Sequence, residues 1–338
     1  MYWKCSDMNY VDPELDSPKE ECGVIGISTP GVDAAQLAFF GIYALQHRGQ
    51  EAAGIAVADG QAVRVHKDMG LVSQVFDAAT LDPLVGGLAI GHTRYSTTGS
   101  SSERNVQPYV VETMHGPLGI AHNGNLVNAD KLREGLLKRG AGLSSSSDSE
   151  VLALMLAATE GDTWEHRLSQ VMGQWQGAFS LVILSGTKVI GCRDPWGFRP
   201  LSMGRLPNGG HALASETGAL RTLGCDNIRE VEPGEIVVLQ GQMARSMKGL
   251  DPAPRQARCT FEQIYFSRPD AIWDDMSIHQ VRQRFGAAVA AEHPVEADVV
   301  IPVPDSSLPA AIGYAAYSGI PYNEGFVKNR YIGRTFIE

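Results

Sequence analysis

Cys22 is the residue whose position indicates chemistry most directly. It opens the apolar run CGVIGIS, which predicts a buried strand, and it follows residues 1–21, an acidic stretch without apolar periodicity. If this leader were removed after Glu21, Cys22 would carry a free α-amino group. Such an amine has a pKa of about 7.7–8.0 and a cysteine thiol one of about 8.5, so the amine can act as base for its own thiol. The alternative is a core side chain, because cysteines outside disulfides are among the most buried residues.

Three further polar sites lie at the ends of predicted elements. Arg94 ends one apolar run, Asn123 and Gly124 end another, and Asp148 lies in the first turn of a predicted helix. Residues at such ends commonly bind ligands. Each site also has an ordinary structural explanation: a surface cation, a hairpin turn of the Asn-Gly type, and an acid stabilised by the helix dipole. Taken singly, these residues leave both interpretations open.

The elements that would position these residues mix strands and helices around one predicted core. Strands are predicted at 53–58, 88–94 and 117–124, a hairpin at 178–194, and helices at 33–47, 128–140 and 147–161. In the last helix, Ser147 and Glu150 predict a capping box. The segments HALASETGAL and GEIVVLQGQM are expected to continue the β structure.

Composition restricts the class of protein. The chain has 338 residues, of which 43% are hydrophobic and 20% charged, as in globular proteins of about two domains. A formal net charge of -10 argues against nucleic acid as a partner, and no apolar run approaches the roughly 20 residues of a membrane span. The N-terminus lacks a secretory signal, and the 5 cysteines have no regular spacing. We therefore expect reduced thiols and a cytoplasmic location.

Five motifs in a fixed order carry a resemblance to a known family. They are ECGVIGI at 21–27, LQHRGQEAAGIAV at 45–57, GHTRYSTTGSS at 91–101, AHNGNLVN at 121–128 and SSSDSE at 145–150. Together they resemble the glutamine amidotransferase domain of the N-terminal-nucleophile family, over about residues 22–245. The resemblance implies an α+β fold, specifically an αββα four-layer sandwich.

The resemblance also implies a role for each matching residue. Cys22 would attack the side-chain amide carbon of glutamine and form a thioester. Asn123 and Gly124 would supply the oxyanion hole through a side-chain amide and a backbone N–H. Arg94 would pair with the α-carboxylate of glutamine, and Asp148 would hold its α-ammonium group.

Two more motif residues, Arg48 and His92, are expected to orient the glutamine-binding residues without touching the reacting bond. Other motifs indicate which acceptor receives the ammonia. They are RDPWGFRPLSMG at 193–204, ASETGAL at 214–220, EVEPGEIV at 230–237, CTFEQIYFSRPD at 259–270, VVIPVPDSS at 299–307 and GFVKNRYIGRTFIE at 325–338. These resemble the amidophosphoribosyltransferase family. The resemblance implies that ammonia from glutamine displaces pyrophosphate from phosphoribosylpyrophosphate (PRPP), which gives phosphoribosylamine, the first step of purine synthesis.

This second resemblance implies four segments and a further set of binding residues. The segments are a leader at 1–21, a glutaminase domain at 22–245, a linker at 246–258 and a partial phosphoribosyltransferase domain at 259–338. Lys328, Arg330 and Arg334 would belong to a loop that closes over PRPP and helps to form an ammonia channel. The alternative for these cations is a solvated basic loop. The full-length protein is expected to be a homo-oligomer.

Two cofactors follow from the same resemblance. Mg²⁺ would accompany PRPP at a site outside this chain, and Cys259 would be one ligand of a [4Fe–4S] cluster in the full-length protein. The acidic pair and phosphate loop of the PRPP signature are not found, since Asp274 and Asp275 match it only superficially. We therefore expect the chain alone to act only as a glutaminase. A stand-alone glutaminase and a catalytically silent regulatory subunit are the alternatives.

Overall fold

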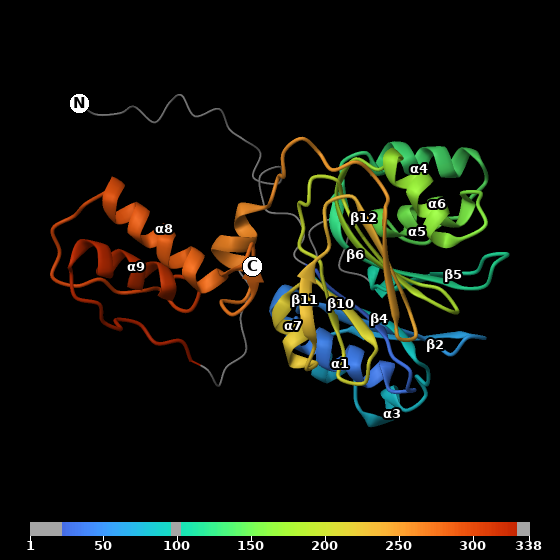
Figure 1. The fold of residues 1–338 in the computed structure, drawn as a ribbon, viewed down its shortest axis with the longest axis horizontal. Helices are drawn as coiled ribbons and strands as arrows, with labels where there is room; N and C mark the ends of the chain where they lie inside the picture. The colour runs from blue at the N-terminus through green and yellow to red at the C-terminus, as the bar shows by residue number, and fades with distance from the viewer. Residues whose placement is uncertain (1–21, 96–102, 330–338) are drawn as a thin grey trace.

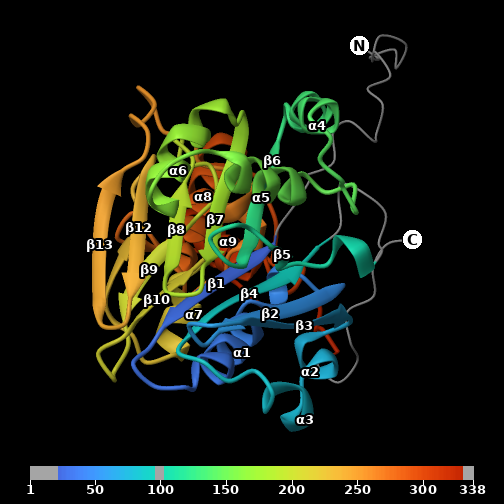
Figure 2. The same cartoon turned by 90° about the vertical axis from the view of Figure 1, so that its right-hand side faces the viewer.

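Two antiparallel sheets stacked face to face form the larger part of the molecule (Figures 1 and 2). The computed structural model describes residues 22–95 and 103–329. Among these residues, the first sheet has seven strands in the order β11-β9-β10-β1-β4-β2-β3. They are β1 (Gly23–Ser28), β2 (Ala52–Ala58), β3 (Val63–Met69), β4 (Leu88–Arg94), β9 (Ser202–Arg205), β10 (His211–Ala214) and β11 (Asp226–Glu230).

The second sheet has six strands within the described ranges, in the order β13-β12-β8-β7-β6-β5. They are β5 (Tyr109–Val111), β6 (Leu118–Leu126), β7 (Gly177–Leu184), β8 (Val189–Arg193), β12 (Glu235–Gln240) and β13 (Met243–Lys248). Both predicted strands that end in candidate site residues are present, as β4 and β6. The predicted hairpin at 178–194 is confirmed as the β7–β8 pair.

Helices cover the outer face of each sheet. The first sheet carries α1 (Ala34–Ala44), η1 (Gln46–Arg48), α2 (Val72–Val75), α3 (Ala78–Leu81) and α7 (Thr217–Thr222). The second carries α4 (Ala129–Lys138), α5 (Asp148–Ala158), α6 (Trp164–Val171) and η3 (Met172–Gln174), while η2 (Glu103–Asn105) precedes β5. This arrangement is the predicted αββα sandwich.

Side chains alternate between the two faces of each strand and so build three apolar layers. On β1, Ile25 and Ile27 pack with α1, whereas Val24 packs between the sheets. On β6, Leu118 and Ile120 face α5 and α6, and Ala121 belongs to the layer between the sheets. The alternation explains why these strands are almost continuously apolar: both of their faces are buried.

The region after β13 contains a separate helical pair (Figure 1). The elements of this region are η4 (Glu262–Phe266), β14 (Ile272–Trp273), β15 (Met276–Ser277), α8 (Ile278–Glu292) and α9 (Leu308–Ser318). Helices α8 and α9 pack side by side. An isolated parallel bridge joins Val300 and Tyr322, which lie on either side of α9 in the chain.

Two sequence expectations differ from the structure in detail. The helix predicted at 33–47 ends at Ala44 and continues as the 3₁₀ turn η1. The segment HALASETGAL, expected to be β structure, enters the short helix α7 after β10. Gly224, at a left-handed φ of 74°, ends this helix. Within the described residues, no helix is long and apolar enough to cross a membrane.

Candidate active site

Cys22 lies at the start of β1, near the middle of the first sheet. Its side chain is 4% exposed. β1 pairs with β4 from Gly23, which faces Thr93, so Cys22 lies beside the end of β4 that carries Arg94. The sulfur is 3.9 Å from the carbonyl oxygen of Tyr95. The two residues that sequence analysis assigned to the nucleophile and to the carboxylate clamp are therefore on neighbouring strand ends.

Arg48 holds the backbone of Cys22 from the opposite side. It occupies the turn η1 and is fully buried, and its Nε donates a hydrogen bond of 3.2 Å to the Cys22 carbonyl. The next residue, Gly49, packs on the end of β4. A Cβ at Gly49 would lie 2.6 Å from backbone atoms of Arg94, so only glycine allows this turn to approach the strand. The structure therefore explains both adjacent residues of the LQHRGQ motif: Arg48 bonds to the Cys22 backbone, and Gly49 lets the turn approach β4.

The guanidinium of Arg48 is paired with two buried carboxylates. Nη1 donates to Glu216 at 2.7 Å and to Glu262 at 2.8 Å, and Nη2 donates to Glu262 at 2.6 Å. Burial alone would lower the pKa of Arg48, but the two carboxylates raise it above the ordinary value. Burial would raise the pKa of Glu216, whereas His47 and Arg48 bring it down to about 2. Burial would also raise the pKa of Glu262, but Arg48 and Arg199 lower it, so all three groups are charged at neutral pH.

Asn123 and Gly124 lie on β6, which packs against β1 and β4. Gly124 has a φ of 150°, and a Cβ there would lie 2.1 Å from the carbonyl oxygen of Ala178. The Asn123 side chain is fully buried, and neither its Nδ2 nor its Oδ1 has a hydrogen-bond partner among the described residues. Such orphaned amide atoms are costly, and a ligand that bonds to them would remove the cost.

His92 ties the two sheets together at this point. Its Nε2 donates a hydrogen bond of 3.1 Å to the carbonyl of His122, which joins β4 of one sheet to β6 of the other. Burial, together with the charge of Arg94, lowers the pKa of His92 to about 3. The ring is therefore neutral, and it orients the residue that precedes Asn123.

Arg94 reaches toward the loop before α5. Its Nη1 donates to the backbone carbonyl of Asn105, and its buried Nε has no hydrogen-bond partner in the part of the chain that the structure describes. Asn105 in turn exchanges two hydrogen bonds of 3.3 Å with Ser146. Arg94 and the serine-rich loop are therefore joined through Asn105, a residue that sequence analysis did not single out.

Asp148 closes the site from the N-terminus of α5. Its Oδ2 accepts a hydrogen bond of 2.9 Å from the backbone of Leu126, at the end of β6. Burial would raise the pKa of Asp148, but His122 and the Leu126 N–H stabilise the carboxylate and lower the pKa below its ordinary value. The group is therefore ionised and fixed near the strand that carries Asn123.

The predicted capping box at the start of α5 is only half right. Ser147 caps the helix, and its hydroxyl accepts a bond from the backbone of Ser149. Glu150 instead reaches past Ser147 and accepts four bonds of 2.6–2.8 Å from the backbone and hydroxyl groups of Ser144 and Ser145. The carboxylate finds more donors in that loop than the single N–H of Ser147 would offer.

The remaining predicted residues lie away from Cys22 or outside the described ranges. Lys328 is half-exposed, with its Nζ 3.3 Å from Asp305, whereas Arg330 and Arg334 fall outside the described residues. Asp274 and Asp275 form the two-residue turn between β14 and β15, both at positive φ. They therefore lie in a hairpin turn, and the interpretation of their likeness to a PRPP-site acidic pair as superficial stays a prediction.

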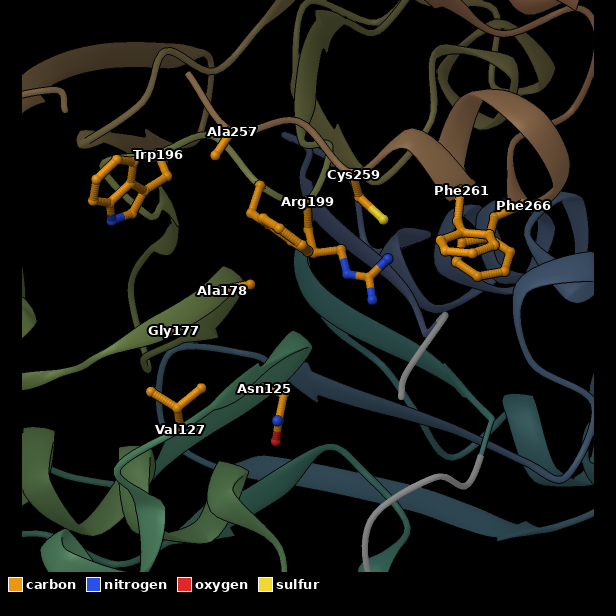
Figure 3. A pocket seen from close by; sticks show the side chains of 11 residues that line it. Asn125, Val127, Gly177, Ala178, Trp196, Arg199, Ala257, Cys259, Phe261 and Phe266 are labelled. Atoms are coloured by element: carbon orange, nitrogen blue, oxygen red, sulfur yellow. The ribbon is translucent and has the colours of Figure 1, made fainter. Parts of the chain in front are cut away.

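Cys259 lines a cavity of about 460 Å³ between the sandwich and η4 (Figure 3). The other lining groups are mainly apolar or aromatic and include Phe261 and Phe266, while Arg199 supplies the guanidinium. Among the described residues, no group of three or more His, Cys, Asp or Glu side chains could hold a metal ion. A cubane cluster usually takes four thiolates, so the described residues do not supply a complete ligand set.

Comparison with known proteins places this site in a family. The family described as "Glutamine amidotransferase domain" matches residues 92–222. Amidophosphoribosyltransferase of Synechococcus elongatus is 49% identical over 328 residues, which cover 96% of this chain and 66% of that protein. Amidophosphoribosyltransferase of Rattus norvegicus is 45% identical over 354 residues, covering 95% and 68%.

A solved structure agrees with these relatives. Glutamine PRPP amidotransferase from B. subtilis, complexed with ADP and GMP, superimposes with a TM-score of 0.86 and 42% identity over 94% of this chain and 68% of that one. The chain spans about two thirds of the length of the relatives it matches. By sequence and by fold, the chain belongs to the amidophosphoribosyltransferase family.

Proposed function

We propose that this chain hydrolyses glutamine at Cys22 and that, in the full-length protein, the ammonia is transferred to PRPP. The products would be glutamate, 5-phosphoribosylamine and pyrophosphate, in the first step of de novo purine biosynthesis. Family membership supports the reaction class. The observation that carries the glutaminase assignment is the buried Asn123 amide, which lacks partners in the described part of the chain and lies on a strand packed against that of Cys22.

Hydrolysis would begin with removal of residues 1–21, which lie outside the described residues. The freed α-amine of Cys22 takes the thiol proton, and the thiolate attacks the amide carbon of glutamine. The Asn123 side chain and the Gly124 N–H stabilise the oxyanion, and one such donor is worth about 2.7–4 kcal/mol in comparable sites. The C–N bond breaks, the α-ammonium returns its proton to the departing ammonia, and water then cleaves the thioester to release glutamate.

Substrate selection would rest on two charges at opposite ends of the glutamine backbone. Arg94 has a buried Nε without a partner among the described residues, which can donate to an α-carboxylate. Asp148 is ionised and can accept from the α-ammonium group. Arg48 and His92 act behind these residues, because Arg48 holds the Cys22 carbonyl and His92 holds that of His122.

The phosphoribosyl half of the proposal depends on residues beyond those that bind glutamine. Lys328, Arg330 and Arg334 would attract PRPP, with Mg²⁺ bound at a site outside this chain. Cys259 would contribute one thiolate to a [4Fe–4S] cluster in the full-length protein. Because the described residues hold no metal-binding group of three or more ligands, we assign no reaction step to either cofactor. By itself, the chain should act only as a glutaminase.

The proposed setting follows from the substrates. Glutamine and PRPP are metabolites of the cytoplasm, where we place the protein, and neither nucleic acid nor a membrane is proposed as a partner. We also propose that the full-length protein is a homo-oligomer.

Product assays test the proposal. The chain without its leader is given glutamine, and glutamate is measured; PRPP and Mg²⁺ with glutamine or ammonia are then supplied, and pyrophosphate is measured. We expect slow release of glutamate that Cys22→Ala abolishes, and no pyrophosphate above background. A silent regulatory subunit would give no glutamate, and pyrophosphate well above background would place the PRPP site within this chain. Active protein that retained residues 1–21 by intact mass would contradict the free-amine mechanism.

A further inference from the structure

Four buried charged side chains form a closed cluster beneath Cys22. Arg48 and Glu262 are fully buried, and Glu216 and Arg199 are 3% and 4% exposed. Arg48 pairs with both carboxylates, and Arg199 lies 3.3 Å from Glu262. We call these four residues the charge cluster. Two positive and two negative groups neutralise one another, so removing any one leaves an uncompensated charge in the interior.

Glu262 accepts four side-chain hydrogen bonds, from three residues. One of its oxygens accepts from Arg48 at 2.6 Å and from Arg199 at 3.3 Å, and the other accepts from Arg48 at 2.8 Å and from Ser267 at 3.0 Å. It belongs to η4, beyond the irregular segment that follows β13. The carboxylate that completes the cluster therefore comes from outside the two sheets. Figure 3 shows Arg199 among the residues that line the cavity, with Trp196 on one side and Phe266 on the other.

Arg48 connects the charge cluster to the nucleophile. Its two terminal nitrogens hold the carboxylates, and its Nε donates to the Cys22 carbonyl at 3.2 Å. The ladder between β1 and β4 begins at Gly23, so Cys22 lies just before the first paired residue. A residue that becomes the chain terminus is joined to the protein by one peptide bond, and Arg48 bonds to the oxygen of that peptide. Holding this peptide plane holds the Cα of Cys22, from which the amine and the thiol extend.

We propose that Glu262 is a positioning residue for Cys22, acting through Arg48. Without the carboxylate, the Arg48 guanidinium would turn toward Glu216 alone and release the Cys22 carbonyl. The nucleophile would then be misplaced although every group that binds glutamine remained intact. This inference rests on the proposed glutaminase function, and it makes the segment around η4 part of the glutaminase machinery.

The test compares Glu262→Gln with a matched control, Glu165→Gln. Glu165 is also buried, at 3% exposed, and pairs with Lys188 and Arg245, but it lies on α6, on the outer face of the second sheet. In the leaderless chain, we expect Glu262→Gln to lower kcat for glutamine hydrolysis by on the order of 10- to 100-fold, as for a small misplacement of a reacting group. KM for glutamine should stay within about twofold, because the binding residues are unchanged.

Two further readouts separate positioning from loss of stability. The rate at which a glutamine-analogue electrophile labels Cys22 should fall in proportion to kcat in Glu262→Gln, and Glu262→Asp should recover part of both. Glu165→Gln should lower the melting temperature and leave kcat and labelling unchanged. A folded Glu262→Gln variant with the kcat of the wild type would overturn the proposal, as would equal losses in the two Gln variants.

If Glu262→Gln does not fold, Ser267→Ala takes its place, because it removes one bond to Glu262 and no charge. We then expect a loss in kcat of about two- to threefold at constant KM, and an unchanged kcat would refute the role of Glu262. Failure of the broader function is recognised separately. A wild-type chain without Cys22-dependent glutamate release would contradict the proposed function itself, whereas an active wild type with insensitive variants would contradict only this inference.

Discussion

Two buried polar regions flank Cys22, and they differ in how completely their atoms are paired. In the charge cluster, both oxygens of Glu262 and both of Glu216 accept hydrogen bonds, and among the described residues Nε of Arg199 is the one buried side-chain atom of the cluster without a partner. Near Asn123, by contrast, the amide atoms of Asn123, Nε of Arg94 and Nε2 of His122 have no partners among the described residues. We call this second group the open region. Saturated groups hold a structure in place, whereas unsatisfied buried groups indicate where a ligand bonds.

The comparison separates two kinds of effect on catalysis. Substitution in the open region should remove contacts with glutamine or with the reacting carbonyl. Substitution in the charge cluster should leave those contacts and disturb the nucleophile. Kinetic constants can distinguish the two, because KM and kcat report on different steps.

Asn123→Ala should give the largest effect in the open region. It removes one oxyanion donor, so kcat for glutamine hydrolysis should fall by about 10²- to 10³-fold while KM changes little. Steady-state glutamate release measures both constants. Ser180→Ala, which changes the residue paired with Asn123 on β7, is the control and should keep most of the activity. An Asn123→Ala variant within tenfold of the wild type would mean that the oxyanion is stabilised elsewhere.

Arg94→Ala should act mainly on binding. A charge-assisted hydrogen bond contributes about 1.5–3 kcal/mol, so KM for glutamine should rise on the order of 10- to 150-fold with a smaller change in kcat. The surface substitution Arg64→Ala, which breaks an exposed ion pair with Asp59, is the matched control. If KM stays constant in Arg94→Ala, the carboxylate of glutamine is bound by another residue.

Glu150→Gln should give a smaller effect of the same type. The variant weakens the four bonds to Ser144 and Ser145 and so loosens the loop that leads to Asp148. We expect KM to rise by about three- to tenfold at nearly constant kcat. The control is Glu235→Gln, which breaks an ion pair between β12 and Arg229 on β11, the edge strand of the first sheet. This variant should leave KM for glutamine unchanged. A fall in kcat without a change in KM would show that the loop does not position the substrate clamp.

The smallest expected effect is a difference between Glu216→Gln and the wild type in how stability depends on pH. This difference reports on the charge cluster. The folded-state pKa of Glu216 is lowered to about 2 by His47 and Arg48 against the opposing effect of burial. A depressed carboxylate pKa adds stability above the unfolded value near ~4.3, and this stability is lost as the pH falls toward about 2. The melting temperature should therefore fall less steeply between pH 5 and pH 3, as rough limits, in Glu216→Gln than in the wild type. Equal slopes would contradict the assignment.

Sequence patterns predicted the strands well because their signal is local. The apolar run at 88–94 coincides with β4, and the helix expected at 147–161 contains α5. The short helix α7 was not predicted, since its six residues lie in a segment with β character. A local apolar pattern is enough to predict an element that is buried on both faces. It is a weak predictor of an element as short as α7.

The partners of the site residues could not be predicted in the same way. Glu262 lies 214 residues from Arg48, and Asn105 lies 41 residues from Ser146. Nothing in the spacing of these residues indicates a contact, because the fold brings them together through two sheets. The motifs ASETGAL and CTFEQIYFSRPD contained Glu216 and Glu262, yet they indicated only a family and not the ion pairs that these residues make.

Active-site labelling tests the central claim, that Cys22 is the nucleophile of a glutaminase, most directly. The leaderless chain is incubated with a glutamine-analogue electrophile, and the modified residue is located by peptide mass spectrometry while glutamate release is followed. We predict one adduct, on Cys22, with loss of activity in proportion and protection by glutamine. Cys192 and Cys259 should remain unmodified. Full inactivation with Cys22 unlabelled, or labelling of Cys22 that leaves glutamate release intact, would contradict the account.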